Sequence, residues 1–141
     1  MILKNLNKDL LINISIILSI FFLDRISKIY VINIDKKLPG SEIFSSKFLN
    51  ISLIWNEGIA FGLLSFEKET FYNFLTLFII LVVMGIFFIS IKSKYLKRYS
   101  FLMILGGALG NLFDRIIYRA VPDFIDFHVG NFHWFIFNVA D

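Results

Sequence analysis

Three long apolar stretches, at about residues 10–32, 71–91 and 99–118, limit what this chain can fold into. Each is long enough to cross the hydrocarbon core of a bilayer as a helix, which takes roughly 20 apolar residues. Apolar residues occupy 57% of the 141 positions, and so short a chain cannot bury that much apolar surface in one water-facing core. We therefore predict an all-α integral membrane bundle, with three transmembrane helices in a single domain that covers residues 1–141.

The charges of the connecting segments predict how the helices are oriented. Segment 92–98 carries four basic residues and no acid, whereas segment 33–70 carries four basic and five acidic residues. Because basic residues are retained on the cytoplasmic side, we place 92–98 and the N-terminus in the cytoplasm, and 33–70 and 119–141 outside. Lys4 and Lys8 precede the first stretch as in a secretory signal peptide, but no small-residue cleavage site follows it, which favours a retained span.

The outer segments carry strand patterns of their own. Residues 48–55 alternate in part between apolar and polar side chains and are rich in β-forming types, which predicts a short strand or hairpin on the outer membrane surface. The aromatic segment 131–137 fits either the lipid headgroup region or a second strand. The predicted fold therefore includes a small strand-rich extracytoplasmic element.

The composition also argues against several functional classes. Cysteine is absent, which rules out a disulfide, a thiolate metal ligand and a thiol nucleophile. The net charge of +3 is modest, which argues against nucleic acid as a partner. His128 and His133 lie near Asp126 but lack the helical spacing of a zinc motif. We therefore expect no metal and no cofactor, and interpret the histidines as interfacial residues.

Charged residues within the apolar stretches are costly there and mark a candidate functional site. Asp24 and Lys28 are four residues apart and share one helix face. Asn111, Asp114 and Arg115 form a set at spacings of three and four residues near the outer end of the third stretch. The simpler interpretation is that Asp24–Lys28 and Asp114–Arg115 are structural ion pairs that hold helices together. The structural and functional roles are compatible with each other.

The predicted topology gathers five aspartates into one layer at the outer membrane face. Two carboxylates that share a proton can activate water and protonate a leaving amine, as in aspartic proteases, without metal or cysteine. The residues alone do not select the pair from Asp24, Asp114, Asp123, Asp126 and Asp141.

Two glycine-rich segments add weaker signals. Gly106, Gly107, Ala108 and Gly110 present small side chains on the third stretch, which on a membrane helix predicts close helix packing. Residues 56–62 predict a tight turn.

Five sequence blocks taken together resemble the lipoprotein signal peptidase family, also called signal peptidase II. They occur in the order found in that family and extend from residue 24 to residue 141. The blocks are Asp24-Arg-Ile-Ser-Lys28, Asn56-Glu-Gly-Ile-Ala-Phe-Gly62, Gly106-Gly-Ala-Leu-Gly-Asn-Leu-Phe-Asp-Arg115, Asp123-Phe-Ile-Asp-Phe127 and Phe137-Asn-Val-Ala-Asp141. The resemblance implies an aspartic endopeptidase of the bacterial inner membrane that removes signal peptides from prolipoproteins, cutting before a diacylglyceryl-modified cysteine.

The resemblance also implies roles for individual residues. Asp123 and Asp141 correspond to the two catalytic aspartates, while Asp24 and Lys28 form a supporting polar pair. The residues expected to line the site or bind substrate are Asn56, Gly58, Asn111, Arg115 and Asn138, and we expect Gly62 to assist in substrate capture. Asp114 and Asp126 correspond to positions that we interpret as structural. The implied partners are prolipoprotein substrates and membrane lipid, and the expected state is a monomer whose active site faces the periplasm.

The sequence departs from the family in lacking a fourth span after the second aspartate. We therefore expect the native protein to be longer, which leaves the activity of the present chain in question. Two other classes stay open from the residues alone. One is a small ion- or proton-handling protein that uses the intramembrane charges as a relay, and the other is a non-catalytic membrane scaffold built on the surface around Gly110.

Overall fold

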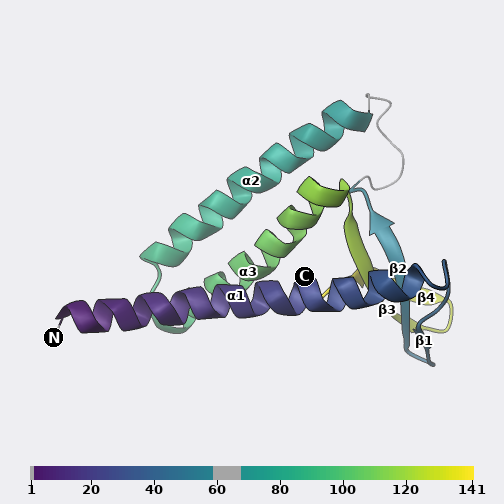
Figure 1. Ribbon diagram of the computed structural model, residues 1–141, viewed down its shortest axis with the longest axis horizontal. Coiled ribbons are helices and arrows are strands. Elements are labelled where there is room, and N and C mark those ends of the chain that lie inside the picture. The colour runs from purple at the N-terminus through teal and green to yellow at the C-terminus, as the bar shows by residue number, and fades with distance from the viewer. Residues whose placement is uncertain (1, 59–67) are drawn as a thin grey trace.

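A computed structural model describes residues 2–58 and 68–141, and its helices have the lengths expected for membrane spans. The helices are α1 (Ile2–Asp35), α2 (Lys68–Lys92) and α3 (Tyr95–Tyr118). By length and composition each contains a segment able to cross a membrane, which confirms the three predicted transmembrane helices. Helix α3 packs against both α1 and α2 and lies between them (Figure 1).

The connection between α2 and α3 is shorter than predicted. Only residues 93–94 separate the two helices, whereas the expected loop was 92–98. Hydropathy marked the end of the apolar stretch, but the backbone hydrogen bonds of a helix continue through the flanking basic residues. The basic cluster therefore lies largely on the ends of α2 and α3.

The small residues of α3 allow α1 to approach it closely, as predicted. A Cβ atom added at Gly106 would lie 2.8 Å from the backbone oxygen of Ile17 and 2.9 Å from Ile20 Cβ, both on α1. A Cβ atom at Gly110 would overlap the carboxylate of Asp24. Gly110 thus leaves the space in which a charged side chain of α1 reaches the surface of α3.

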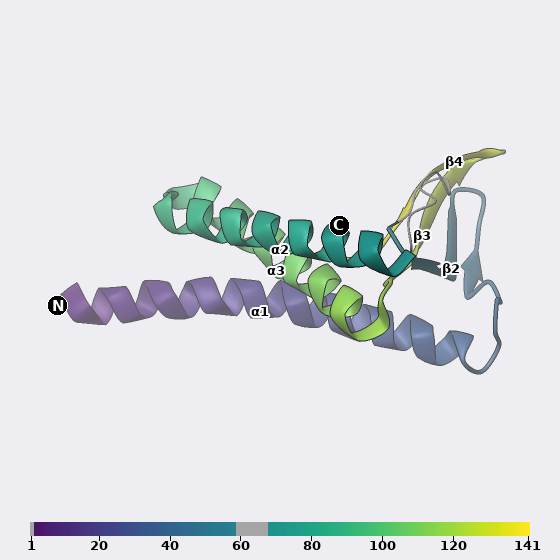
Figure 2. The same ribbon diagram turned by 90° about the horizontal axis from the view of Figure 1, so that it is seen from above.

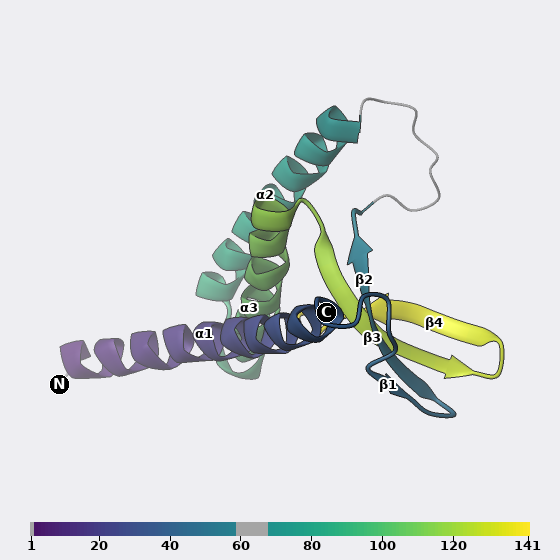
Figure 3. The same cartoon turned by 45° about the vertical axis from the view of Figure 1, so that its right-hand side comes forward.

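Four antiparallel strands form a sheet in the order β1-β2-β3-β4 at one end of the helices (Figure 3). They are β1 (Phe44–Ser45), β2 (Leu49–Asn56), β3 (Val121–Val129) and β4 (Phe132–Phe137). Strand β2 confirms the strand predicted at 48–55, and β4 shows that segment 131–137 forms a strand. Strand β3 was not predicted, because most of its side chains are buried on both faces and its proline and two aspartates have low strand propensity.

Two short connections bring the sheet to the outer part of α3. Helix α3 ends at Tyr118 and is capped by Arg119, which adopts a left-handed conformation with φ of 56°. Strand β3 starts two residues after Arg119. After β4 the chain returns to the helices (Figure 2). The backbone of Ala140 lies directly against Gly107 of α3. Residues 123 and 138–141 are thereby held beside the same helix.

Most large apolar side chains of the helices are exposed. The buried apolar residues are few and include Val31, Leu102, Leu105, Val121 and Phe124. Such a surface suits lipid rather than water as the solvent, as expected for the membrane bundle predicted from the sequence.

Candidate active site

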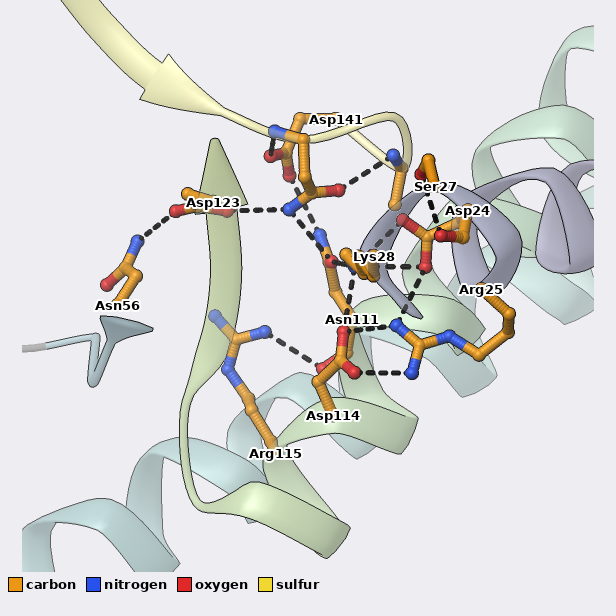
Figure 4. Close-up of polar contacts among 12 residues, drawn as sticks. Asp24, Arg25, Ser27, Lys28, Asn56, Asn111, Asp114, Arg115, Asp123 and Asp141 are labelled. Atoms are coloured by element: carbon orange, nitrogen blue, oxygen red, sulfur yellow. Dashed lines mark hydrogen bonds and ion pairs between the residues drawn. The ribbon is translucent and has the colours of Figure 1, made fainter. Parts of the chain in front are cut away.

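A fully buried ammonium group lies at the contact between α1 and α3. Lys28 has no exposed surface, and its Nζ atom donates to Asp24 Oδ2 at 2.9 Å, to Asp114 Oδ2 at 2.7 Å and to Asn111 Oδ1 at 2.6 Å (Figure 4). The helical spacing of Asp24 and Lys28 explains the first contact, and the glycines of α3 allow the others. The predicted Asp24–Lys28 pair is therefore present, but it is part of a larger cluster.

Arg25 is the member of this cluster that sequence reasoning missed. Its guanidinium contacts Asp114 through two nitrogens, at 2.6 Å and 2.8 Å, and Asp24 at 3.3 Å. It also lies over the Phe113 ring, 5.1 Å from the centroid. The sequence feature that could have identified Arg25 is that it is a third charged residue within the first apolar stretch, next to Asp24. Two acids and two bases, Asp24, Asp114, Arg25 and Lys28, thus form a neutral group that we call the buried charge cluster.

Arg115 does not pair with Asp114, so the predicted Asp114–Arg115 ion pair is wrong. The side chain of Asp114 faces Lys28 and Arg25, while Arg115 donates to the backbone oxygen of Asn111 at 3.2 Å. Among the residues that the structure describes, the guanidinium of Arg115 forms no ion pair. Helix geometry accounts for this, since residues 114 and 115 point in directions about 100° apart.

Asp123 lies on β3 and is nearly inaccessible, with 4% of its surface exposed. Its two oxygens accept hydrogen bonds from separate amides, Asn138 Nδ2 at 2.7 Å and Asn56 Nδ2 at 2.9 Å. Burial raises the pKa of the Asp123 carboxyl above its usual value, and the charge of Asp141 acts in the same direction. The two amide donors and the ammonium of Lys28 oppose this shift only in part.

Asp141 lies on the other side of Asn138 and is exposed. Its Oδ1 atom accepts from Asn111 Nδ2 at 2.8 Å, and its Oδ2 atom accepts from the backbone N–H of Asn138 at 3.0 Å. Asn138 is itself buried, with 2% of its surface exposed. One asparagine therefore contacts both aspartates, the first through its side chain and the second through its backbone.

Asn56 reaches Asp123 from the end of β2. Its side-chain oxygen accepts a hydrogen bond from the backbone N–H of Gly58 at 2.8 Å, which turns its amide nitrogen toward the aspartate. Gly58 has a φ of +75°, and a Cβ atom there would lie 2.6 Å from Leu75 Cδ2 on α2. The predicted turn is thus built around a glycine at this position, while Gly62 lies outside the described residues.

A cleft of about 360 Å³ opens beside Asp123. It is lined by the end of β2 and by one residue from each of β3 and β4, namely Ile54, Trp55, Asn56, Glu57, Asp123 and Ile136. Its walls combine apolar side chains with carboxylate and amide groups.

The fifth aspartate is held by a histidine on the sheet. Asp126 Oδ2 lies 2.8 Å from His133 Nδ1, and the rings of His128 and His133 stack with centroids 5.2 Å apart. Within the described part of the chain, no group of three His, Cys, Asp or Glu residues has the geometry of a metal site.

These contacts define a class of protein: a multi-pass membrane protein with two carboxylates gathered around one asparagine, beside a buried charge cluster. A family model for "Signal peptidase (SPase) II" matches residues 16–141. The chain belongs to the signal peptidase II family, which makes it a membrane peptidase.

Several known proteins are similar to this chain. It is 47% identical over 134 residues to the lipoprotein signal peptidase of Pelagibacter ubique (strain HTCC1062), covering 95% of this chain and 81% of that protein. It is 40% identical over 135 residues to the lipoprotein signal peptidase of Anaplasma phagocytophilum (strain HZ), covering 93% and 83%. A solved bacterial membrane enzyme, determined by the in meso method at 1.9 Å resolution, superposes with a TM-score of 0.70 at 29% identity, covering 92% of this chain and 82% of the other.

Proposed function

We propose that this chain is an aspartic endopeptidase that removes signal peptides from prolipoproteins, with Asp123 and Asp141 as its catalytic pair. The observation that carries the proposal is the position of Asn138, which donates to Asp123 at 2.7 Å and to Asp141 at 3.0 Å. Carboxylates gathered in this way can share one proton, because two like charges held close together cannot both ionise freely. Membership of the signal peptidase II family supports this reading of the pair.

In the proposed reaction, the ionised carboxylate of the pair removes a proton from a water molecule that attacks the scissile carbonyl carbon. A C–O bond forms, and the carbonyl oxygen takes up the displaced electron pair. The protonated carboxyl then gives its proton to the leaving nitrogen as the C–N bond breaks. The products are a carboxylic acid and an amine, and the pair has exchanged its proton from one aspartate to the other.

We assign substrate contacts to the polar side chains around the pair. Asn56 lines the cleft beside Asp123 and is held by the backbone N–H of Gly58, so the two residues are placed to position the peptide backbone. Within the described residues, the guanidinium of Arg115 donates one hydrogen bond, to a backbone oxygen of its own helix, and its remaining N–H groups can hold the developing oxyanion. Asn111 and Asn138 orient the two carboxylates from the helix side.

The cut is placed before the diacylglyceryl-modified cysteine, whose lipid reaches the pair from the bilayer along the apolar surface of the helices. We place the protein in the bacterial inner membrane with the pair at its outer face. The basic segment between α2 and α3 supports this orientation, because it lies at the end of the helices farthest from the sheet (Figure 1). A monomer suffices, since one chain supplies both aspartates.

The experiment compares the purified protein with its Asp123→Asn and Asp141→Asn variants in lipid vesicles, using a diacylglyceryl-modified prolipoprotein as substrate. Each change keeps the side-chain shape but removes the carboxylate needed for proton transfer, so each variant should lose cleavage by at least about a hundredfold. An Asp126→Asn variant is the matched control, because it changes another β3 aspartate that the proposed reaction does not use. Substantial turnover by either catalytic variant would refute the assignment.

A further inference from the structure

The orientation of the Asn111 amide is fixed by a residue outside the carboxylate pair. An ammonium group has donors only, so whatever faces Lys28 Nζ at 2.6 Å must be an acceptor. The side-chain oxygen of Asn111 therefore points at Lys28. A second donor, Asn138 Nδ2, reaches the same oxygen at 3.2 Å. Because both donors contact the side-chain oxygen of Asn111, its NH₂ group points away from Lys28 and Asn138 Nδ2.

The NH₂ group of Asn111 is directed at Asp141, to which it donates at 2.8 Å. The other oxygen of Asp141 also accepts an N–H group, from the Asn138 backbone at 3.0 Å. Donors of this kind stabilise an ionised carboxylate relative to a protonated one. If the amide were reversed, its oxygen would face Asp141 and favour the protonated form instead.

We infer that Lys28 is a positioning residue that, by holding the amide of Asn111, keeps Asp141 as the ionised, water-activating member of the pair and leaves the proton on Asp123. This inference rests on the proposed function. The accessibilities of the two residues agree with it, since Asp123 is buried and Asp141 is exposed. A carboxyl group out of contact with water holds its proton more readily than one in contact with water.

The other charged groups near Asp141 do not take over the role proposed for the Asn111 amide, which is to select the ionised member of the pair. The buried charge cluster on α1 and α3 contains two acids and two bases, so its net charge is zero. Arg115 lies one turn from Asn111 on α3 and donates to its backbone oxygen. Asp123 on β3 repels a second negative charge, which favours one proton on the pair but does not by itself select the aspartate that carries it.

The test is the pH dependence of kcat/KM for cleavage in lipid vesicles, measured for wild type, Lys28→Met and Arg25→Met. Without Lys28 the Asn111 oxygen keeps the longer contact from Asn138 Nδ2, at 3.2 Å, which holds the amide less firmly and lets its oxygen turn toward Asp141. We expect the acid limb of the Lys28→Met profile to move to higher pH by about one unit, which is about a tenfold loss of kcat/KM on that limb, the size expected from losing one hydrogen bond to a charged group. Arg25→Met is the matched control, because Arg25 belongs to the same cluster but does not contact Asn111.

Arg25→Met should therefore lower stability while leaving the acid limb in place. Lys28→Met combined with Asp24→Asn keeps the cluster neutral and should show the same displacement, which separates loss of the Asn111 contact from loss of the Lys28 charge, since that charge by itself lowers the pKa of Asp123. An acid limb that stays in place in the Lys28 variants, or that moves equally in Arg25→Met, overturns the inference. That outcome leaves the catalytic pair standing as long as Asp141→Asn is inactive, whereas an active Asp141→Asn variant refutes the proposed function itself.

Discussion

Removing one acid from the buried charge cluster should destabilise the fold more than removing an acid and a base together. The cluster holds Asp24, Asp114, Arg25 and Lys28, and none of the four has more than 7% of its surface exposed. Asp24→Ala leaves two bases facing one acid, so one positive charge remains uncompensated away from water. Breaking a buried ion pair in this way costs about 3–5 kcal/mol, and Lys28→Ala should cost a similar amount because it leaves one acid in excess.

The double change Asp24→Ala with Lys28→Ala leaves the Arg25–Asp114 pair, whose two contacts of 2.6 Å and 2.8 Å remain intact. That pair is neutral, so the combined loss of unfolding free energy should fall short of the sum of the single losses by about 1–3 kcal/mol. The assay is a double-mutant cycle on unfolding in detergent, with cleavage measured in parallel. Asp24→Ala should lower stability and activity together.

The chain offers a matched control at its surface. Glu69 and Arg119 form an ion pair at 3.2 Å, and both side chains are 67% exposed. The cycle Glu69→Ala with Arg119→Ala should give a coupling of at most about 1 kcal/mol, because water compensates exposed charges. Additive losses at Asp24 and Lys28 would show that the two residues do not interact energetically. Loss of activity in Asp24→Ala with stability intact would place Asp24 in the catalytic machinery.

Two further predictions concern Gly58 and Asp123. Gly58→Val should abolish most cleavage while the protein stays in the membrane, because the left-handed backbone that directs Asn56 at Asp123 does not suit a side chain. Gly130→Val is the control, because Gly130 has a φ of +59° and open space around it in the turn between β3 and β4. Loss of the Gly58 variant from the membrane would show that the Gly58 turn is structural. For Asp123, the raised pKa means that the native state binds its proton more tightly than the unfolded state does, so the free energy of unfolding should fall as pH rises from the usual 3.8 to the raised value. Asp123→Asn should lack this decline, and parallel stability curves for the two proteins between pH 3.5 and pH 7 would contradict the prediction.

Much of the helical part of this fold could be predicted from the sequence, because a bilayer restricts both the length and the polarity of what crosses it. The small residues of α3 predicted close packing for a similarly local reason, since Gly106 and Gly110 lack the atoms that would keep α1 away. Asp24 and Lys28 share a helix face through their spacing alone. Each of these inferences depends on neighbours within a few residues or on the solvent.

Tertiary structure decided the contacts between residues distant in sequence. Lys28 and Asn111 are 83 residues apart, and Arg25 and Asp114 are 89 apart, so no local pattern indicates that they meet. The chemical types of these residues were visible, but the partner of each depends on how α1 and α3 cross. For this reason the sequence suggested Asp114 with Arg115, while the structure pairs Asp114 with Arg25 and Lys28.

The positions of Asp123 and Asp141 on either side of Asn138 are likewise decided by the tertiary structure. They require β3 to pair with β2, β4 to return the chain to α3, and Gly107 to admit the backbone of Ala140. No strand was predicted at β3, because burial on both faces removes the alternation of apolar and polar residues by which strands are recognised. Hydrogen bonds act over about 3 Å, so the orientation of each carboxylate is determined only when every element that surrounds it is in place.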